Sequence, residues 1–176
     1  MKKQFSFPTL STGKLTLRQL KVSDAKEIFI LRSDLNVNKY LDRELSNSID
    51  DAKKFIRIVN ENFDKNKSFY WAVCLANSEA LVGTVCLFNF SAENNNCEIG
   101  FELLPQYQKS GIMREAVKAI INYAFNSLRV GKIQAFTHPE NINSQKLLEK
   151  MQFKKSASPE PSNIELLYFT LDNNEI

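Results

Sequence analysis

The segment QKSGIM, residues 108–113, combines the residue types that bind a phosphate. Gly111 lacks a side chain, so a ligand can approach the main chain closely, and Lys109 and Arg114 add positive charge beside it. Where such a loop opens a helix, the first backbone N–H groups lack intrahelical partners and the helix dipole adds partial positive charge. A phosphate or pyrophosphate binds well there. The alternative is a basic loop that binds nothing, since one glycine among polar residues is not specific.

A strand before this segment and a helix after it would position the loop. The strand pattern alternates, with one face formed by Cys97, Ile99, Phe101 and Leu103 and the other by Glu98, Gly100 and Glu102. Pro105 ends the strand, because proline cannot donate to a β-ladder. From Met113 to Leu128 the apolar residues recur at helical spacing. The loop is therefore expected at a sharp strand-to-helix turn.

Composition limits the class of protein. The 176 residues are enough for one domain with a core, and 43% apolar and 24% charged residues are typical of a soluble globular protein. A net charge of +3 argues against a strongly basic nucleic-acid binder. No apolar run reaches the roughly 18–20 residues of a membrane-spanning helix, and the first residues do not resemble a secretory signal.

The three cysteines, Cys74, Cys86 and Cys97, are far apart in apolar strand-like runs. Their spacing matches neither a metal site nor a disulfide framework, so they are interpreted as reduced, buried thiols. These observations predict a cytoplasmic protein that binds no metal.

The remaining pattern predicts a single α+β domain, residues 1–176, with the element order β α α β β β α β α β β. Residues 1–13 are expected to be a loose arm, and residues 35–46 a loop or frayed helix. Ser48 and Asp51 resemble a capping box at the start of the second helix. Predicted strands are Leu15–Leu20, Phe69–Leu75, Leu81–Phe90, Cys97–Leu103, Lys132–Thr137, Phe153–Ser156 and Glu165–Leu171, and predicted helices include Asp24–Arg32 and Ser144–Met151.

Two motifs carry a resemblance to a known family. EIGFEL followed by PQYQKSGIMREA resembles motif A of the GNAT N-acetyltransferases, Q/R-x-x-G-x-G/A, with Gln108, Gly111 and, loosely, Met113 in the matching positions. ENINSQKLLEKMQF resembles the family's N-x-x-S segment, with Asn141 and Ser144 matching. The opening KLTLRQLKVSDAKEIFIL is similar to the ribosomal-protein alanine N-acetyltransferase-like (RimJ/RimL-type) branch.

The resemblance implies a mixed, mostly antiparallel sheet that is splayed open between Cys97–Leu103 and Lys132–Thr137, with acetyl-CoA in the opening. The pyrophosphate would lie on main-chain amides of residues 109–114, and the pantetheine arm beside residues 101–103. Asn141 and Ser144 would face the amide and thiol end. The expected cofactor-binding residues are Phe101, Glu102, Leu103, Gln108, Lys109, Ser110, Gly111, Ile112, Met113, Arg114, Asn141 and Ser144.

Two residues depart from the family pattern. Met113 stands where the motif has Gly or Ala, and its side chain is expected to point into the helix packing without loss of cofactor binding. Gln152 replaces the glycine before Phe153. If that position is a left-handed helix C-cap, Gln152 costs about 1 kcal/mol of stability.

Acetyl transfer to an amine needs a neutral amine, a polarised thioester carbonyl and a proton for the departing thiolate. Within the resemblance, Glu98 is the candidate base, directly or through water, with Glu102 as its rival; either could instead be a solvated strand carboxylate. Ser144 could protonate the thiolate and also N-cap its helix. His138, the only histidine, is not expected to be catalytic, and Tyr40 could belong to an acceptor pocket.

The resemblance therefore implies an acetyl-CoA-dependent N-acetyltransferase. The acceptor could be a protein N-terminus or a small amine, bound by residues 24–64, where the sequence carries no specific motif. The alternatives are a non-catalytic acyl-CoA-binding regulatory domain and a ribosome- or RNA-associated module. The expected partners include no membrane and no nucleic acid outside a ribosome, and the chain could be a monomer or a homodimer.

Overall fold

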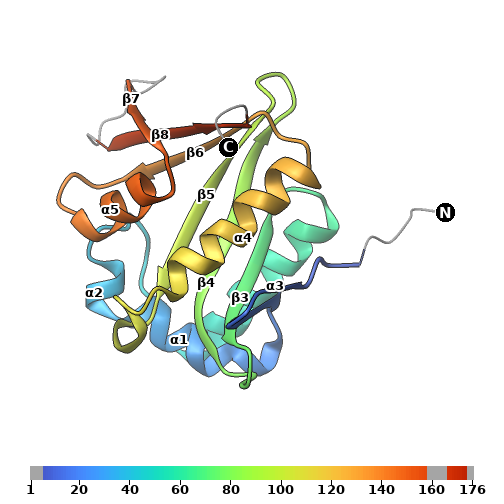
Figure 1. The fold of residues 1–176 in the computed structure, drawn as a ribbon. Helices are drawn as coiled ribbons and strands as arrows, with labels where there is room; N and C mark the ends of the chain where they lie inside the picture. Colours follow the sequence, from blue (N-terminus) through green and yellow to red (C-terminus); the bar gives the residue numbers. More distant parts are fainter. Residues whose placement is uncertain (1–5, 158–165, 174–176) are drawn as a thin grey trace.

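The structure, a computed structural model, describes residues 6–157 and 166–173. Its strands form one sheet in the order β1-β2-β3-β4-β5-β6-β8-β7 (Figure 1). The strands are β1 Leu10–Ser11, β2 Leu15–Gln19, β3 Phe69–Leu75, β4 Leu81–Ser91, β5 Asn96–Leu103, β6 Lys132–Thr137, β7 Lys154–Ser156 and β8 Leu167–Asp172. The helices are α1 Ala25–Ser33, α2 Leu35–Asn38, α3 Ile49–Asp64, α4 Ile112–Asn126 and α5 Ile142–Lys150, with 3-10 turns η1 Val22–Asp24 and η2 Pro105–Tyr107.

The sheet is mostly antiparallel and opens in its middle. Among the described strands, β5 and β6 are the parallel pair, and only Asn96–Glu98 of β5 are in register with Lys132–Gln134 of β6. Beyond Glu98 the two strands separate, although β5 continues to Leu103 and β6 to Thr137. Figure 1 shows this divergence, with the N-terminal end of α4 beside it. The mixed, mostly antiparallel fold predicted from the sequence is confirmed.

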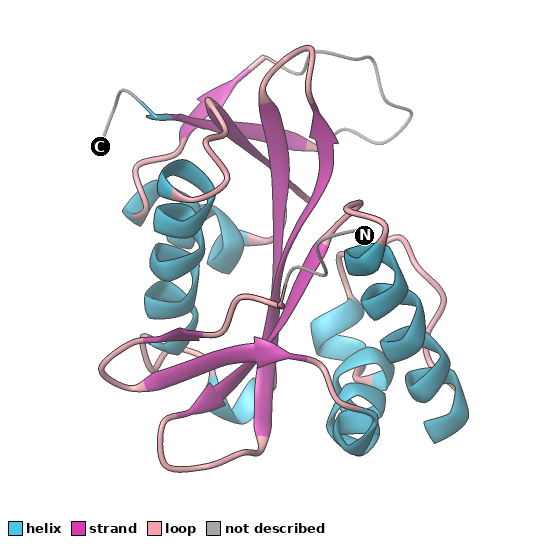
Figure 2. Ribbon diagram, turned by 90° about the vertical axis from the view of Figure 1, so that its right-hand side faces the viewer, coloured by secondary structure: helices cyan, strands magenta, loops and turns pink. Residues whose placement is uncertain are grey.

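Helices cover both faces of the sheet (Figure 2). The apolar stripe of α4, which includes Ala116, Val117 and Ile120, packs with Trp71 into the larger core. Helices α1 and α3 lie on the other face and build a smaller core around Ile56. Because successive strand residues point to opposite faces, the odd-numbered residues of β5 face α4, and Glu98 and Glu102 face the other side.

Local capping explains where two helices begin. The Ser48 hydroxyl accepts from the Asp51 amide at 3.1 Å, so the predicted N-cap of α3 is confirmed. The Asp51 carboxylate reaches back to the amide of Asn47 and not of Ser48, so the capping box is shifted by one residue. Helix α5 begins earlier than predicted: the side chain of Asn141 accepts from the Ser144 amide at 3.1 Å. Asn141, and not Ser144, is therefore its N-cap.

Three further predictions differ from the structure. The expected loose arm contains β1, which pairs with Leu17 and Thr16 of β2. The segment expected as a loop or frayed helix contains α2, whose first turn is capped by the Asp34 side chain. The predicted strand from Glu165 begins outside the described residues, and the structure places β8 at Leu167–Asp172. No described helix is both long and apolar enough to span a membrane.

Candidate active site

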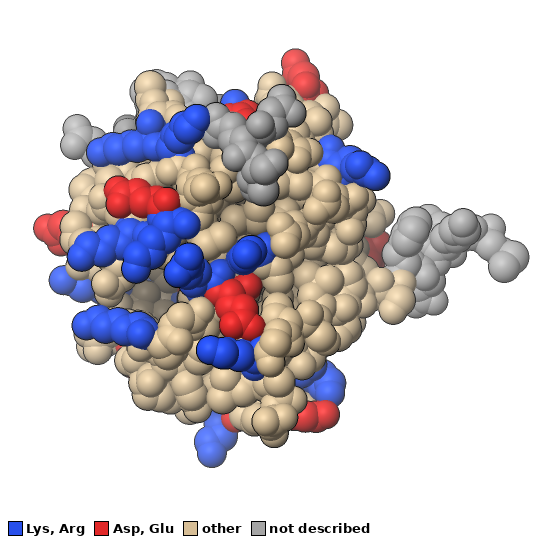
Figure 3. All heavy atoms as spheres, viewed as in Figure 1, with Lys and Arg blue, Asp and Glu red and all other residues tan. Residues whose placement is uncertain are grey.

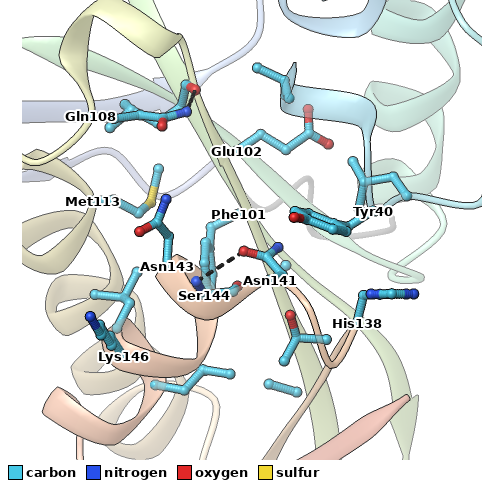
Figure 4. A pocket seen from close by; sticks show the side chains of 18 of the residues that line it. Tyr40, Phe101, Glu102, Gln108, Met113, His138, Asn141, Asn143, Ser144 and Lys146 are labelled. Carbon is cyan, nitrogen blue, oxygen red and sulfur yellow. Dashed lines mark hydrogen bonds between the residues drawn. The ribbon is translucent and has the colours of Figure 1, made fainter. Parts of the chain in front are cut away.

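A cavity of about 1040 Å³ lies where β5 and β6 separate. It is bounded by β5, the loop before α4, the start of α4, the end of β6, α5 and the segment around α2 (Figure 4). Its described lining residues include Lys39, Tyr40, Leu41, Asp42, Phe101, Glu102, Leu103, Gln108, Lys109, Gly111, Met113, Arg114, His138, Asn141, Asn143, Ser144, Lys146 and Lys150. Most of the predicted site residues therefore come together in one place.

The loop and first helical turn at residues 109–114 border this cavity, with Lys109, Gly111, Met113 and Arg114 among its lining residues. Within the described part of the chain, none of the main-chain amides of residues 109–114 donates a hydrogen bond to protein; the next amide, that of Glu115, donates to the Gly111 carbonyl. Lys109 and Gly111 have positive φ angles of 61° and 83°, which turn successive N–H groups toward one side. A Cβ at Gly111 would meet nothing within 4 Å. Open space next to unpaired amides fits an anionic ligand such as a pyrophosphate.

Positive charge surrounds this part of the cavity. Lys109 and Arg114 come from the loop and the first turn of α4, and Lys146 and Lys150 come from α5. Lys and Arg side chains gather around the hollow on this face (Figure 3). Coenzyme A carries three phosphate groups, so four cations beside free amides fit its nucleotide end.

Gln108 connects the C-terminal end of β5 to the loop that follows it. Its Nε2 donates to the Leu103 carbonyl at 3.1 Å, which holds the turn against the strand end. The Ser110 hydroxyl donates to the Tyr107 carbonyl within the same turn. Both bonds fix the loop that carries the amides. Of the predicted contacts, Ser110 and Ile112 are not among the described residues that line the cavity, and Ile112 packs its side chain against the core.

Asn141 and Ser144 line the middle of the cavity, near Phe101 (Figure 4). The Asn141 side chain caps α5, and the Ser144 hydroxyl has no hydrogen-bond partner among the described residues. The Nδ1 atom of His138 accepts from the Glu140 amide at 3.1 Å, so a neutral His138 carries its proton on Nε2.

The two candidate carboxylates are held differently. Glu98 is not among the described residues that line the cavity, and its Oε1 accepts from the Asn89 amide group at 3.0 Å. Glu102 lines the cavity, but both of its oxygens bind Arg43, one at 2.9 Å to Nη2. The side chain of Glu102 is 12% exposed and that of Arg43 is 19% exposed. This ion pair removes the free anion that Glu102 would otherwise present.

Sequence reasoning named Glu102 but missed its partner Arg43. Arg43 also donates from Nε to the Asn38 side chain at 2.7 Å, and Asn38 in turn donates to the carbonyls of Leu31 and Asp34. Arg43 thus ties β5 to the helical segment at the other side of the cavity. An arginine in a polar stretch has no distinguishing spacing, so nothing in the sequence indicates this role.

An aromatic contact closes one side of the cavity. The Tyr40 and His138 rings stack with centroids 5.3 Å apart and planes 23° apart. The Lys39 ammonium lies 4.9 Å from the centre of the Tyr40 ring. The predicted acceptor region, residues 24–64, therefore contributes residues 36–42 to the cavity. Figure 4 draws Tyr40, Glu102 and His138 on one side and Gln108, Met113 and Lys146 on the other.

The two departures from the family pattern have clear structural outcomes. Met113 is 7% exposed and packs in the larger core, as expected, while it also lines the cavity. Gln152 has φ 67°, so it occupies a left-handed position. Its amide donates to Glu149, and the Phe153 amide donates to Leu148, which is the bond pattern of a Schellman C-cap. The expected strain at Gln152 therefore has a geometric basis.

Comparison with known proteins agrees with this geometry. The model of the acetyltransferase (GNAT) domain family matches residues 14–154. An uncharacterized N-acetyltransferase of Bacillus subtilis, YoaA, is 30% identical over 149 residues, 85% of this chain and 84% of that protein. A spermidine N(1)-acetyltransferase of Vibrio cholerae is 26% identical over 141 residues, 80% of this chain and 79% of that protein.

A solved structure supports the fold. A ribosomal-protein alanine acetyltransferase of Vibrio fischeri superposes with a TM-score of 0.78 at 23% identity, over 96% of this chain and 98% of that chain. At this identity the likeness establishes the arrangement of strands and helices alone. The arrangement includes the opened sheet described above.

Proposed function

The chain belongs to the acetyltransferase (GNAT) family, and from that premise we propose that it moves an acetyl group from acetyl-CoA directly to a primary amine. Acetyl-CoA supplies the activated acetyl group as a thioester. The protein then has to hold both reactants in one orientation and to manage two protons, one leaving the amine and one reaching the sulfur.

One observation carries the proposal: free main-chain amides at residues 109–114 lie beside a cavity that runs into the opening between β5 and β6. The amides and the nearby Lys109 and Arg114 would hold the phosphates. The β5 segment Phe101–Leu103 borders β4 on one edge and the opening on the other, so main-chain groups on that open edge are available to the pantetheine arm.

Within this proposal, Ser144 gives a proton to the departing sulfur. Its hydroxyl lines the cavity without a partner among the described residues, and Asn141 holds its amide. Glu98 stays the predicted base. Because it lies outside the described cavity lining and binds Asn89, the amine proton would reach it through water. Glu102 is assigned no base role, because Arg43 holds both of its oxygens.

The acceptor would enter from the side formed by residues 36–42 and His138. The names of the relatives give two classes of acceptor, a polyamine in one and a ribosomal protein in another. The compartment proposed is the cytoplasm, because all three cysteines are free thiols.

The test is release of the coenzyme A thiol, followed with a chromogenic disulfide, when acetyl-CoA is mixed with peptides and small amines. Ser144→Ala should lower kcat at least about tenfold with little change in coenzyme A affinity, because only the proton donor is lost. Ser127→Ala is the matched control, since Ser127 is exposed at the far end of α4.

Glu98→Gln in the same assay should lower kcat and change its pH profile. Turnover that is unchanged at every pH would remove Glu98 from the mechanism. Wild-type protein that binds acetyl-CoA in calorimetry but releases no thiol with any amine would contradict the proposed function. That result would favour a non-catalytic acyl-CoA-binding domain.

A further inference from the structure

The charges that line the cavity divide into two groups. The cations of the cofactor side, Lys109, Arg114, Lys146 and Lys150, come from the α4 loop and α5, where the free amides are. On the acceptor side the described charged lining residues are Lys39, Asp42 and Glu102. The second group therefore decides which amines can enter.

Glu102 does not count as a free anion in this group. Arg43 binds both of its carboxylate oxygens, and both side chains are largely buried, at 12% and 19% exposure. A bidentate arginine pair satisfies the carboxylate geometrically as well as electrically. With Glu102 neutralised, Asp42 is the one carboxylate without an ion pair among the described residues of the acceptor side.

The aromatic ring of Tyr40, on the acceptor side, is already in contact with other groups of the protein. A ligand cation can bind over an aromatic face, but the Lys39 ammonium already lies 4.9 Å from the centre of the Tyr40 ring. The imidazole of His138 stacks on the same ring at 5.3 Å. Tyr40 therefore offers little to a second cation, and Lys39 adds positive charge where that cation would sit.

A polyamine carries two or more ammonium groups, and each one removed from water needs a carboxylate or a free aromatic face. Among the described residues that line the cavity, the acceptor side offers one unpaired carboxylate and one cation, so this lining matches a ligand with one charge of each sign. We propose, on the basis of the function proposed above, that the acceptor is an amine with a carboxylate near it, such as an amino acid or an acidic peptide N-terminus, and not a polyamine.

In this arrangement Asp42 attracts the incoming ammonium and Lys39 binds the carboxylate. Asp42 and Lys39 are exposed, and neither is required by the core, so both can be changed without unfolding the protein. Lys39 then determines specificity without taking part in the proton transfers.

The experiment compares matched acceptors in the thiol-release assay: ornithine against putrescine, lysine against cadaverine, and peptides with Glu against peptides with Lys at the second position. Each of the two small-molecule pairs differs by one carboxylate, and the two peptides differ by two units of charge. Wild-type kcat/KM should favour the carboxylate-bearing member by about fivefold or more, the effect of one ion pair near a surface. Lys39→Glu should abolish or reverse that preference. Lys26→Glu, at an exposed position on α1, is the matched control and should leave the preference unchanged.

The outcomes separate the two proposals. Preference for spermidine, putrescine or cadaverine over the carboxylate-bearing partners would overturn the acceptor assignment while the proposed function stands. An unaltered preference in Lys39→Glu would overturn the role of Lys39. No thiol release with any acceptor would overturn the proposed function and this assignment with it.

Discussion

Substitution of Gly111 tests the phosphate site most directly. A Cβ added at Gly111 would meet no atom within 4 Å, so the main cost of adding it is the backbone strain of φ 83°. Asn and Asp are the residues that tolerate this left-handed conformation best, and they have nearly the same shape. Gly111→Asn and Gly111→Asp therefore form a matched pair that differs by one negative charge beside the amides of residues 109–114.

The size of the effect follows from the charges. A carboxylate about 5 Å from one phosphate charge weakens binding by about 0.8 kcal/mol at the dielectric constant of water and about 1.7 kcal/mol at half that value. Against the two charges of a pyrophosphate the difference between the variants is about 2–3 kcal/mol, or about 30- to 150-fold in Kd.

Isothermal titration calorimetry with coenzyme A measures this difference, and thermal unfolding of both variants checks that they are folded. The difference in Kd between Gly111→Asp and Gly111→Asn should become smaller as salt is added, because exposed charges are screened. Equal Kd values for the two variants at low salt would refute the position of the phosphates on these amides.

The remaining predictions concern stability and titration. Gln152→Gly should raise the free energy of unfolding by about 0.5–1 kcal/mol in denaturant titration, because glycine adopts φ 67° without strain; Lys150→Gly, inside α5, should lower it instead. Burial, and then the neighbouring Glu98 carboxylate, raises the pKa of the Cys97 thiol to about 12. Because the unfolded thiol titrates near about 8.5, this thiol costs no stability below that pH, and by itself it lowers the free energy of unfolding by about 2.7 kcal/mol at pH 10.5; Cys97→Ala should lessen the loss. In native protein at pH 8 all three thiols should react slowly with a disulfide reagent, since burial is the main cause that raises the pKa of each; rapid labelling of Cys97 would contradict its placement.

Periodicity predicted the parts of the fold that a simple pattern describes. The bounds of β3 and β6 match the prediction, and the apolar stripe that begins at Met113 lies on the sheet as expected. These segments alternate at one constant spacing, so burial alone determines their structure. Segments with short or mixed patterns were predicted less well: β1 was not predicted, and residues 35–46 were left open between a loop and a frayed helix, because tertiary pairing stabilises β1 and a single Asp34 cap stabilises α2.

The sequence predicted the part of the candidate site that depends on main-chain geometry. A position with positive φ favours glycine, so the glycine at the strand-to-helix turn, Gly111, could be recognised in the sequence. Contacts between side chains that are distant in the sequence cannot be recognised in this way. The pairing of Arg43 with Glu102 joins residues 59 positions apart, and Tyr40 stacks on His138, which is also distant in the sequence, so only the folded structure brings them together.

The narrow junction between β5 and β6 has a consequence for how long the protein survives. Three residue pairs join the β1–β5 part of the sheet to the β6, β8 and β7 part. A ligand bound in the opening between β5 and β6 adds RT ln(1 + [L]/Kd) to the free energy of unfolding. This term is about 2.7 kcal/mol when the ligand concentration is a hundred times Kd. Protease resistance should then rise with occupancy of this opening, whether acetyl-CoA or coenzyme A fills it.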